Sequence, residues 1–228
     1  MNKKVSVITP SFNKKEYVQD AIESVMSQTH TDFEYWVIEN STDIETKNTV
    51  KDIFADYRDE RMHYVDEYFT DRERKERYPT AVLLNKYYDL MTGDFMFYIS
   101  DDDVLEKDCF KEMIESFDSN SEIMVNWHGQ MTVDVRDRGQ QNTVSTRNAD
   151  YTIMAGTTAD CVIDGGVIMF RRECLNEIEK PYYVETYPEA GHCDGLFMNK
   201  LNKKWSFFPV RKVLSTHRRT KLSTWDRI

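Results

Sequence analysis

The chain has 228 residues, and its 40 acidic and 30 basic side chains give a formal net charge of −10. Apolar residues make up 40% of the sequence and aromatic residues 13%, which is enough to build a hydrophobic core and excludes a disordered chain. No apolar run reaches the roughly 20 residues that a membrane-spanning helix needs, and no signal-peptide core is present. From these two observations we expect a soluble, cytoplasmic protein, and the acidic balance disfavours a general nucleic-acid coat protein.

Several common catalytic and metal-binding signatures are missing from the sequence. The four cysteines include no C-x-x-C pair and the five histidines no H-x-x-x-H pair, which disfavours a zinc ribbon, a thioredoxin site and a zincin helix. There is no G-x-S-x-G, no Walker A loop and no G-x-G-x-x-G. Serine hydrolases, P-loop NTPases and ordinary dinucleotide-binding dehydrogenases are therefore disfavoured as well.

The first half of the chain alternates between strand and helix patterns. Short apolar, β-branched or aromatic runs predict strands at Val5–Thr9 (which Pro10 would stop), Phe33–Ile38, Met62–Val65, Asp94–Ser100 and Ile123–Trp127. Helical spacing of apolar residues predicts helices from Asn13 onward and over Thr46–Tyr57, Val82–Met91 and Lys107–Phe117. This alternation predicts an α/β sandwich with a mainly parallel sheet.

The second half has a less regular pattern. Residues 129–160 are polar, which predicts loops and short strands. A strand over Val167–Phe170, a short helix over Leu196–Leu201 and a last strand over Ser206–Val210 are expected. Residues 211–228 form a basic tail with six Lys or Arg residues and a single acid.

Three polar clusters directly follow predicted strands of the first half: Pro10–Asn13, Glu39–Asp43 and Asp101–Asp103. In parallel α/β sheets the ligand binds at the carboxyl ends of the strands. The Asp101–Asp103 triplet is the strongest signal, because three successive carboxylates repel one another unless a cation lies among them. A turn or helix cap that uses one aspartate is the alternative. Oxygen ligands of this kind suit Mg²⁺ or Mn²⁺ and a phosphate-bearing substrate.

The order of motifs resembles that of a family 2 glycosyltransferase with the GT-A fold. The matching segments are VSVITPSFN, AIESVMSQTHTDFEYWVIENSTD and, after Asn85, TGDFMFYISDDDVL, which together span about the first 115 residues, and HCDGLFMNKL and THRRTKLS match more loosely. The closest pattern is that of the spore-coat polysaccharide biosynthesis type. The resemblance implies a Rossmann-like three-layer αβα sandwich in a single domain of residues 1–228. Its parts would be a nucleotide-binding half (1–115), an acceptor half (116–210) and the basic tail (211–228).

The resemblance also assigns the donor nucleotide to particular residues. Phe12, in the loop that lines the base, would stack on a pyrimidine. Glu39 and Asn40 stand where the family usually has paired aspartates, and this departure leaves the identity of the base open. The full set expected to bind the nucleotide-sugar is Pro10, Ser11, Phe12, Glu39, Asn40, Arg72, Arg77, Asp101, Asp164, Arg218 and Arg219.

The D-x-D element of the family implies a metal site. Asp101 would bind the ribose and Asp102 the metal, with Asp103 as a further ligand or an acceptor beside it, and Mn²⁺ or Mg²⁺ as the cofactor. His217 would complete the metal shell, while Arg218 and Arg219 would hold the pyrophosphate as the tail closes over the nucleotide.

Asp194 falls where the family has its general base, which implies an inverting displacement by an acceptor hydroxyl. Asp164 would touch the donor sugar or the acceptor. A UDP-sugar is the expected partner, with UDP-glucose as the default donor. A glycan, a cell-wall polymer, a protein or a modified nucleic acid stays open as the acceptor. A sugar-1-phosphate nucleotidyltransferase, whose first loop needs glycines that ITPSFN lacks, and a non-catalytic sugar-binding module are the alternatives.

Overall fold

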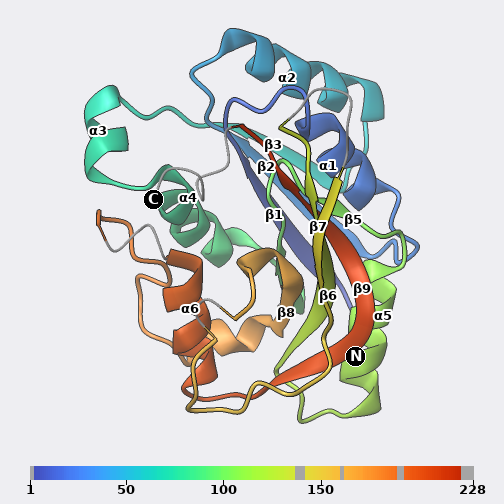
Figure 1. Cartoon of the computed structure of the whole chain (residues 1–228). Coiled ribbons are helices and arrows are strands. Elements are labelled where there is room, and N and C mark those ends of the chain that lie inside the picture. The colour runs from blue at the N-terminus through green and yellow to red at the C-terminus, as the bar shows by residue number, and fades with distance from the viewer. Residues whose placement is uncertain (1–2, 137–141, 160–161, 189–192, 222–228) are drawn as a thin grey trace.

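The computed structural model describes residues 3–136, 142–159, 162–188 and 193–221, and these residues form one twisted sheet with helices on both faces (Figure 1). The strands are β1 Val5–Ser11, β2 Phe33–Glu39, β3 Met62–Asp66, β4 Phe95–Tyr98, β5 Val104–Leu105, β6 Val125–Asp134, β7 Asn142–Arg147, β8 Ile168–Arg171 and β9 Phe207–Arg219. The α-helices are α1 Val18–Met26, α2 Ile44–Tyr57, α3 Asp71–Glu76, α4 Pro79–Tyr87, α5 Cys109–Ser119 and α6 Cys193–Asn202. Short 3₁₀ turns are η1 Tyr88–Leu90, η2 Gly165–Val167 and η3 Arg172–Asn176.

The strands of the first half form the parallel part of the sheet. The strand order is β3-β2-β1-β4-β8-β6-β9-β5, with β7 paired to β6 outside this path. Strands β3, β2, β1 and β4 are parallel, whereas β8 is antiparallel to both of its neighbours and β9 is parallel to β6. The carboxyl ends of β1, β2 and β4 therefore meet at one edge, where the sequence places its three polar clusters.

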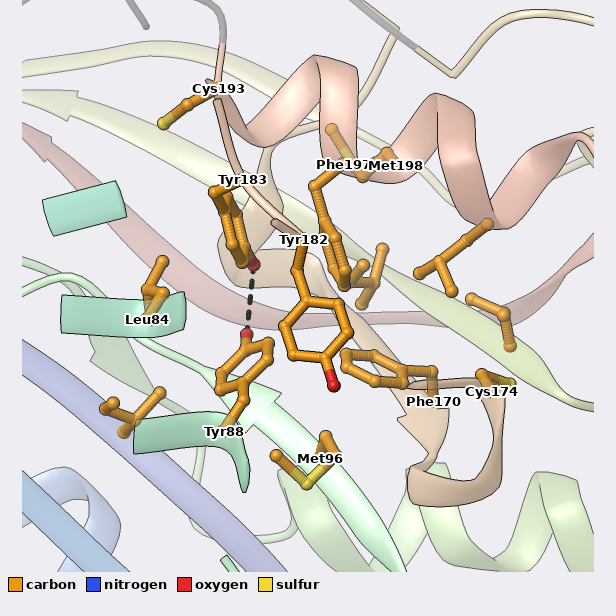
Figure 2. Close-up of a cluster of buried hydrophobic side chains, with 14 of the residues drawn as sticks. Leu84, Tyr88, Met96, Phe170, Cys174, Tyr182, Tyr183, Cys193, Phe197 and Met198 are labelled. Carbon is orange, nitrogen blue, oxygen red and sulfur yellow. Dashed lines mark hydrogen bonds between the residues drawn. The ribbon is translucent and has the colours of Figure 1, made fainter. Parts of the chain in front are cut away.

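Two hydrophobic cores cover the two faces of the sheet and give three layers. One core joins α1, α2 and α5 to the sheet through residues such as Ile22, Val50 and Phe110. The other joins α4 and α6 to the opposite face. Figure 2 shows part of this second core, where Tyr88 and Tyr183 share a hydrogen bond of 3.0 Å between their hydroxyl groups. The predicted αβα sandwich is confirmed.

Two predicted element boundaries are wrong, the end of the first strand and the start of the first helix. Strand β1 continues through Pro10 to Ser11, pairing with β2. Proline has no N–H to donate, and this is tolerated here because alternate residues of a strand direct their N–H and C=O groups to the same side. The carbonyl of Ile8 accepts from the N–H of Ile99 on the β4 side, so the nitrogen of Pro10 also faces that side. It lies beyond the last β1–β4 pair, where the sheet needs no donor. The first helix begins at Val18 rather than near Asn13, whose positive φ of 53° is typical of asparagine in a turn.

The second half contains more strand than its polar sequence predicts. Strand β6 runs to Asp134 and β7 pairs with it, within the span expected to form loops and short strands. Strand β9 runs from Phe207 to Arg219, so the first nine residues of the expected tail belong to the sheet, where β9 pairs with β6 and β5. Residues 222–228 lie outside the described part of the chain. No helix in the described ranges is long and apolar enough to cross a membrane.

A buried carboxylate, Glu34, joins three segments at the amino end of the parallel strands. It accepts hydrogen bonds from Ser6 Oγ, from the N–H of Thr92 at 2.6 Å and from Lys4 Nζ at 3.3 Å. Burial alone would raise the pKa of Glu34, but these hydrogen bonds and the Lys4 charge outweigh it and hold the pKa below its ordinary value. The adjacent Gly93 has no room for a side chain, since a Cβ atom there would lie 2.6 Å from Ser6 Oγ.

We expect Glu34→Gln to lower the free energy of unfolding at pH 7 by about 1–3 kcal/mol, because it removes a buried charge that accepts several hydrogen bonds. The folded-state pKa of Glu34 is lowered, so its contribution is full above the ordinary value of 4.5 and is lost as the pH falls through the folded-state pKa. Urea unfolding at pH 7 and at pH 3 measures the difference. Glu60→Gln, at an exposed glutamate, is the control. An equal loss of stability at both pH values would contradict this account.

Candidate active site

The loops after β1, β2 and β4 contact one another directly, as the strand-end pattern predicts. The N–H of Phe12 donates to Asp101 Oδ2 at 2.8 Å, and the side chain of Asn40 donates to the carbonyl of Ser11 at 2.8 Å. Asn13 binds the β2 loop through its N–H, which donates to Ser41 Oγ at 2.7 Å. These contacts fix the first loop against the aspartate triplet, so that the ring of Phe12, 40% exposed, lies at the surface of the site.

Three buried polar atoms beside Phe12 have no hydrogen-bond partner within the described residues. They are Ser11 Oγ, Glu39 Oε2 and Arg74 Nε. Glu39 itself is fully buried, and its other carboxylate oxygen accepts from the N–H of Ser41. Buried polar groups in folded proteins are nearly always paired, so this set of one acceptor, one donor and one hydroxyl favours a polar ligand at this position.

Arg74 was not among the residues predicted for this site, yet it contacts Phe12 and Asn40, which were predicted to bind the nucleotide. Its guanidinium lies over the Phe12 ring at 4.6 Å and donates to Asn40, to Oδ1 at 3.1 Å and to the carbonyl oxygen. Arg72, which was predicted to bind the nucleotide, is highly exposed and pairs with Glu76 on its own helix. The local signal that could have helped to separate them is the Thr70–Glu73 capping box, which fixes the start of α3.

Arg77, a predicted nucleotide contact, and Asn85 both bind the segment before α6. Arg77 pairs with Glu185. Asn85 exchanges hydrogen bonds with the backbone of Tyr183 and also donates to Glu185 at 2.8 Å. In this structure, therefore, Arg77 and Asn85 hold the second half of the chain against α4, and the predicted nucleotide contact of Arg77 stays a prediction.

The aspartate triplet is buried, and the cation beside its first two members is Lys14. The ammonium of Lys14 lies 3.4 Å from Asp101 Oδ1 and also binds Asp102 Oδ2. Ser100 Oγ donates to the other oxygen of Asp102 at 2.7 Å. Burial raises the pKa of Asp101 despite Lys14, whereas for Asp102 the lysine outweighs burial and lowers the pKa.

His217 is the charged partner of Asp103. Its Nδ1 lies 2.9 Å from Asp103 Oδ1. Burial alone would lower the pKa of His217, but the hydrogen bond and the charge of Asp103 raise it to about 9. His217 is therefore an imidazolium at neutral pH, and it would have to lose a proton before it could bind a metal ion.

The side chains around the aspartate triplet are of the types that bind a divalent cation, but in this structure they are arranged as ion pairs. Carboxylate oxygens and an imidazole are suitable ligands for Mn²⁺ or Mg²⁺. In the described part of the chain, no group of three or more acidic, histidine or cysteine side chains is arranged to hold a metal ion. Lys14 stands against Asp101 and Asp102, so a metal at Asp102 would displace its ammonium.

Two glycines separate the aspartate triplet from Asp194, the predicted general base. A Cβ atom on Gly165 would lie 3.2 Å from the Cβ of Asp194, and one on Gly166 would lie 3.7 Å from Asp103 Oδ2. Small residues at both positions therefore let the start of α6 approach the aspartate triplet. Burial raises the pKa of Asp194, the N–H of Gly195 opposes this, and the nearby Asp164 raises the pKa further.

The remaining predicted side chains lie around this centre. Asp164 is 3.2 Å from Arg147 of β7 in an ion pair. Arg219 is half-buried, and its carbonyl accepts from the N–H of Val135. Arg218 is buried and bound to Asp20 on the other side of the strand. The predicted pyrophosphate contacts of Arg218 and Arg219 stay predictions.

Comparisons with known proteins identify the family and the fold of the chain. The sequence model of glycosyl transferase family 2 matches residues 6–179. Protein CgeD from Bacillus subtilis is 29% identical over 223 residues, which cover 96% of this chain and 51% of that protein. The putative teichuronic acid biosynthesis glycosyltransferase TuaG, from the same organism, is 34% identical over 113 residues, covering 49% of this chain and 40% of that protein. The chain thus spans about half the length of these relatives, or less.

Solved structures share the fold. The TarS 1–349 structure from S. aureus in complex with UDP-GlcNAc matches with a TM-score of 0.65 and 16% identity, over 99% of this chain and 61% of the other. The mannosyltransferase PcManGT from Pyrobaculum calidifontis, in complex with GDP-Man and Mn²⁺, matches with a TM-score of 0.65 and 15% identity, over 95% of this chain and 57% of the other. At these identities the likeness concerns the fold.

We expect Lys14→Met to lower the free energy of unfolding at pH 7 by about 3 kcal/mol, because it leaves buried carboxylates without their cation. Mn²⁺ should then raise the melting temperature of the variant more than that of the unchanged protein. Thermal unfolding with and without Mn²⁺ measures both effects. Lys15→Met is the control, since Lys15 is exposed and pairs with Glu45 at the surface. Equal effects of Mn²⁺ on all three proteins would contradict this role of the aspartate triplet.

Proposed function

Because the chain belongs to glycosyl transferase family 2, we propose that it transfers a hexose from a UDP-sugar to an acceptor hydroxyl, with UDP-glucose as the donor. The observation that carries the proposal is the set of unpaired buried atoms beside the exposed ring of Phe12: Ser11 Oγ, Glu39 Oε2 and Arg74 Nε. A planar base with its own donors and acceptors satisfies such a set, whereas an apolar ligand does not.

The base of the nucleotide is proposed to bind between the β1 and β2 loops. Phe12 offers its exposed ring for stacking, and Arg74 supports the ring from one side at 4.6 Å. Glu39 Oε2, being an acceptor without a partner, suits the N–H between the two carbonyl groups of uracil. The TarS complexes with UDP-GlcNAc and UDP support a uridine nucleotide in this fold.

The diphosphate is proposed to bind at the aspartate triplet. Asp102 and Asp103 would hold a divalent cation, Mn²⁺ or Mg²⁺, which when bound would neutralise the negative charge that develops on the departing UDP. The PcManGT complex with Mn²⁺ supports such a cofactor. Lys14, once free of Asp102, would reach the phosphates, while protonated His217 would keep Asp103 in place.

Asp194 is proposed as the general base that takes the proton of the acceptor hydroxyl. Its raised pKa makes the carboxylate a stronger proton acceptor than an exposed aspartate. A direct attack by the hydroxyl on the sugar, opposite the leaving diphosphate, inverts the configuration. Asp164, which faces Arg147 and lies near Asp194, is proposed to contact the donor sugar or the acceptor.

The acceptor is proposed to be a glycan or cell-wall polymer, as the name of the relative TuaG suggests for that protein. A sugar-1-phosphate nucleotidyltransferase is not favoured, since the loop after β1 contains no glycine. The cytoplasmic location expected from the sequence stays a prediction.

We expect Arg74→Ala to weaken UDP binding by about tenfold, because it removes the cation behind Phe12 and the support of the Asn40 loop. Arg72→Ala, two residues earlier on the same helix, should bind UDP as the unchanged protein does, since Arg72 points into solvent. Calorimetric titration with UDP measures both. Equal affinities of the two variants would contradict the position of the base.

We expect Asp194→Asn to slow transfer by about 10²–10⁴-fold, since the amide cannot take the proton, while UDP affinity is unchanged. The measurement is the release of UDP from UDP-glucose and other UDP-hexoses, with calorimetry for UDP binding. Asp52→Asn, in the exposed part of α2, is the control. Transfer at the original rate by Asp194→Asn would contradict the assignment of the base.

A further inference from the structure

The end of strand β9 packs against the aspartate triplet. The end of β9 pairs with β5 directly after the triplet, with Thr216 opposite Val104. Side chains of a strand alternate between its faces, and β9 places His217 on the face of Asp103 and Asp164. Thr216 and Arg218 therefore point to the opposite face, where they line a cavity of about 730 Å³ next to α1.

From the side of β9 that lines this cavity, Arg218 connects three segments of the chain. Its backbone N–H donates to Asp103 Oδ1 at 3.3 Å, and its Nε donates to the carbonyl oxygen of Asp102. The same guanidinium donates to the carbonyl of Tyr17 at 3.1 Å and forms an ion pair with Asp20 on α1. One side chain thus connects the triplet, the turn before α1 and the helix itself.

The charge of Arg218 needs a partner, because the side chain is only 8% exposed. Asp20 is the only carboxylate that forms an ion pair with this guanidinium within the described ranges. Without Asp20, the guanidinium would have no carboxylate as an ion-pair partner within the described ranges, and its contact with the carbonyl oxygen of Asp102 would lose that anchor.

We propose that Asp20 is a positioning residue that anchors Arg218 on the side of β9 that lines the cavity, so that the charged carboxylates of Asp102 and Asp103 stay oriented toward the donor site. Asp20 is largely exposed, and its link to the triplet runs through Arg218. The part that concerns binding of a diphosphate and its cation rests on the proposed function. The anchoring of the aspartate triplet by Asp20 does not.

The test compares Asp20→Asn with Glu23→Gln. Glu23 is three residues further along α1, is exposed and lines the same cavity, but its carboxylate accepts from Gln19 rather than from Arg218. Two-dimensional NMR of the free protein should show shifted amide signals for Asp102, Asp103 and Arg218 in Asp20→Asn only. Asp20→Glu, which restores the charge, should return these signals toward their original positions.

The second measurement is calorimetric titration with UDP in the presence and absence of Mn²⁺. We expect Asp20→Asn to weaken Mn²⁺-dependent UDP binding by about tenfold, with little change in the absence of Mn²⁺ and rescue by Asp20→Glu. Unchanged NMR signals at the triplet, or equal effects of Asp20→Asn and Glu23→Gln, would overturn the proposal. If the unchanged protein binds no UDP, the proposed function fails, and the NMR result alone decides whether Asp20 anchors the triplet.

Discussion

The burial of three successive carboxylates is the constraint on which the site depends. Asp101, Asp102 and Asp103 are all nearly inaccessible to solvent, and burying such charges without partners would cost several kcal/mol for each. Cations from two distant segments of the chain offset this cost. Lys14 comes from the loop after β1, while His217 comes from the end of β9. The two ends of the sequence are thereby brought to one loop.

The order of the strands brings the end of β9 beside the triplet. Strand β9 crosses from β6 to β5 and ends beside the aspartate triplet, so the last described segment closes the site formed by the first four strands. The ligand edge is thus built from both halves, and the glycines Gly165 and Gly166 let the start of α6 approach it. The arrangement explains why Asp194, far along the sequence, lies near the triplet.

The sequence predicts the parallel half well because there each strand is a short apolar run that ends in a polar cluster, and parallel strands must bring those clusters together. It fails where tertiary pairing overrides local pattern. The basic residues of β9 suggest a tail outside the sheet, yet Leu214 and Ser215 are buried within it. Arg72 and Arg74 lie on different faces of the short helix α3. This helix is too short for the spacing of its apolar and polar residues to show which face is turned toward the site.

The requirement for a cation was predictable from the triplet, but its identity was not. Three adjacent carboxylates indicate a positive charge without saying whether a metal ion or a side chain provides it. In the structure the ammonium of Lys14 stands where a metal bound to Asp102 would replace it. In the proposed function, this internal cation would keep the loop folded before the donor arrives, and its release would give the incoming diphosphate a positive group nearby. Under that proposal, the stability of the free protein and its affinity for the donor would be opposed at the two oxygens of Asp101 and Asp102 that Lys14 contacts, which would link folding to binding in this chain.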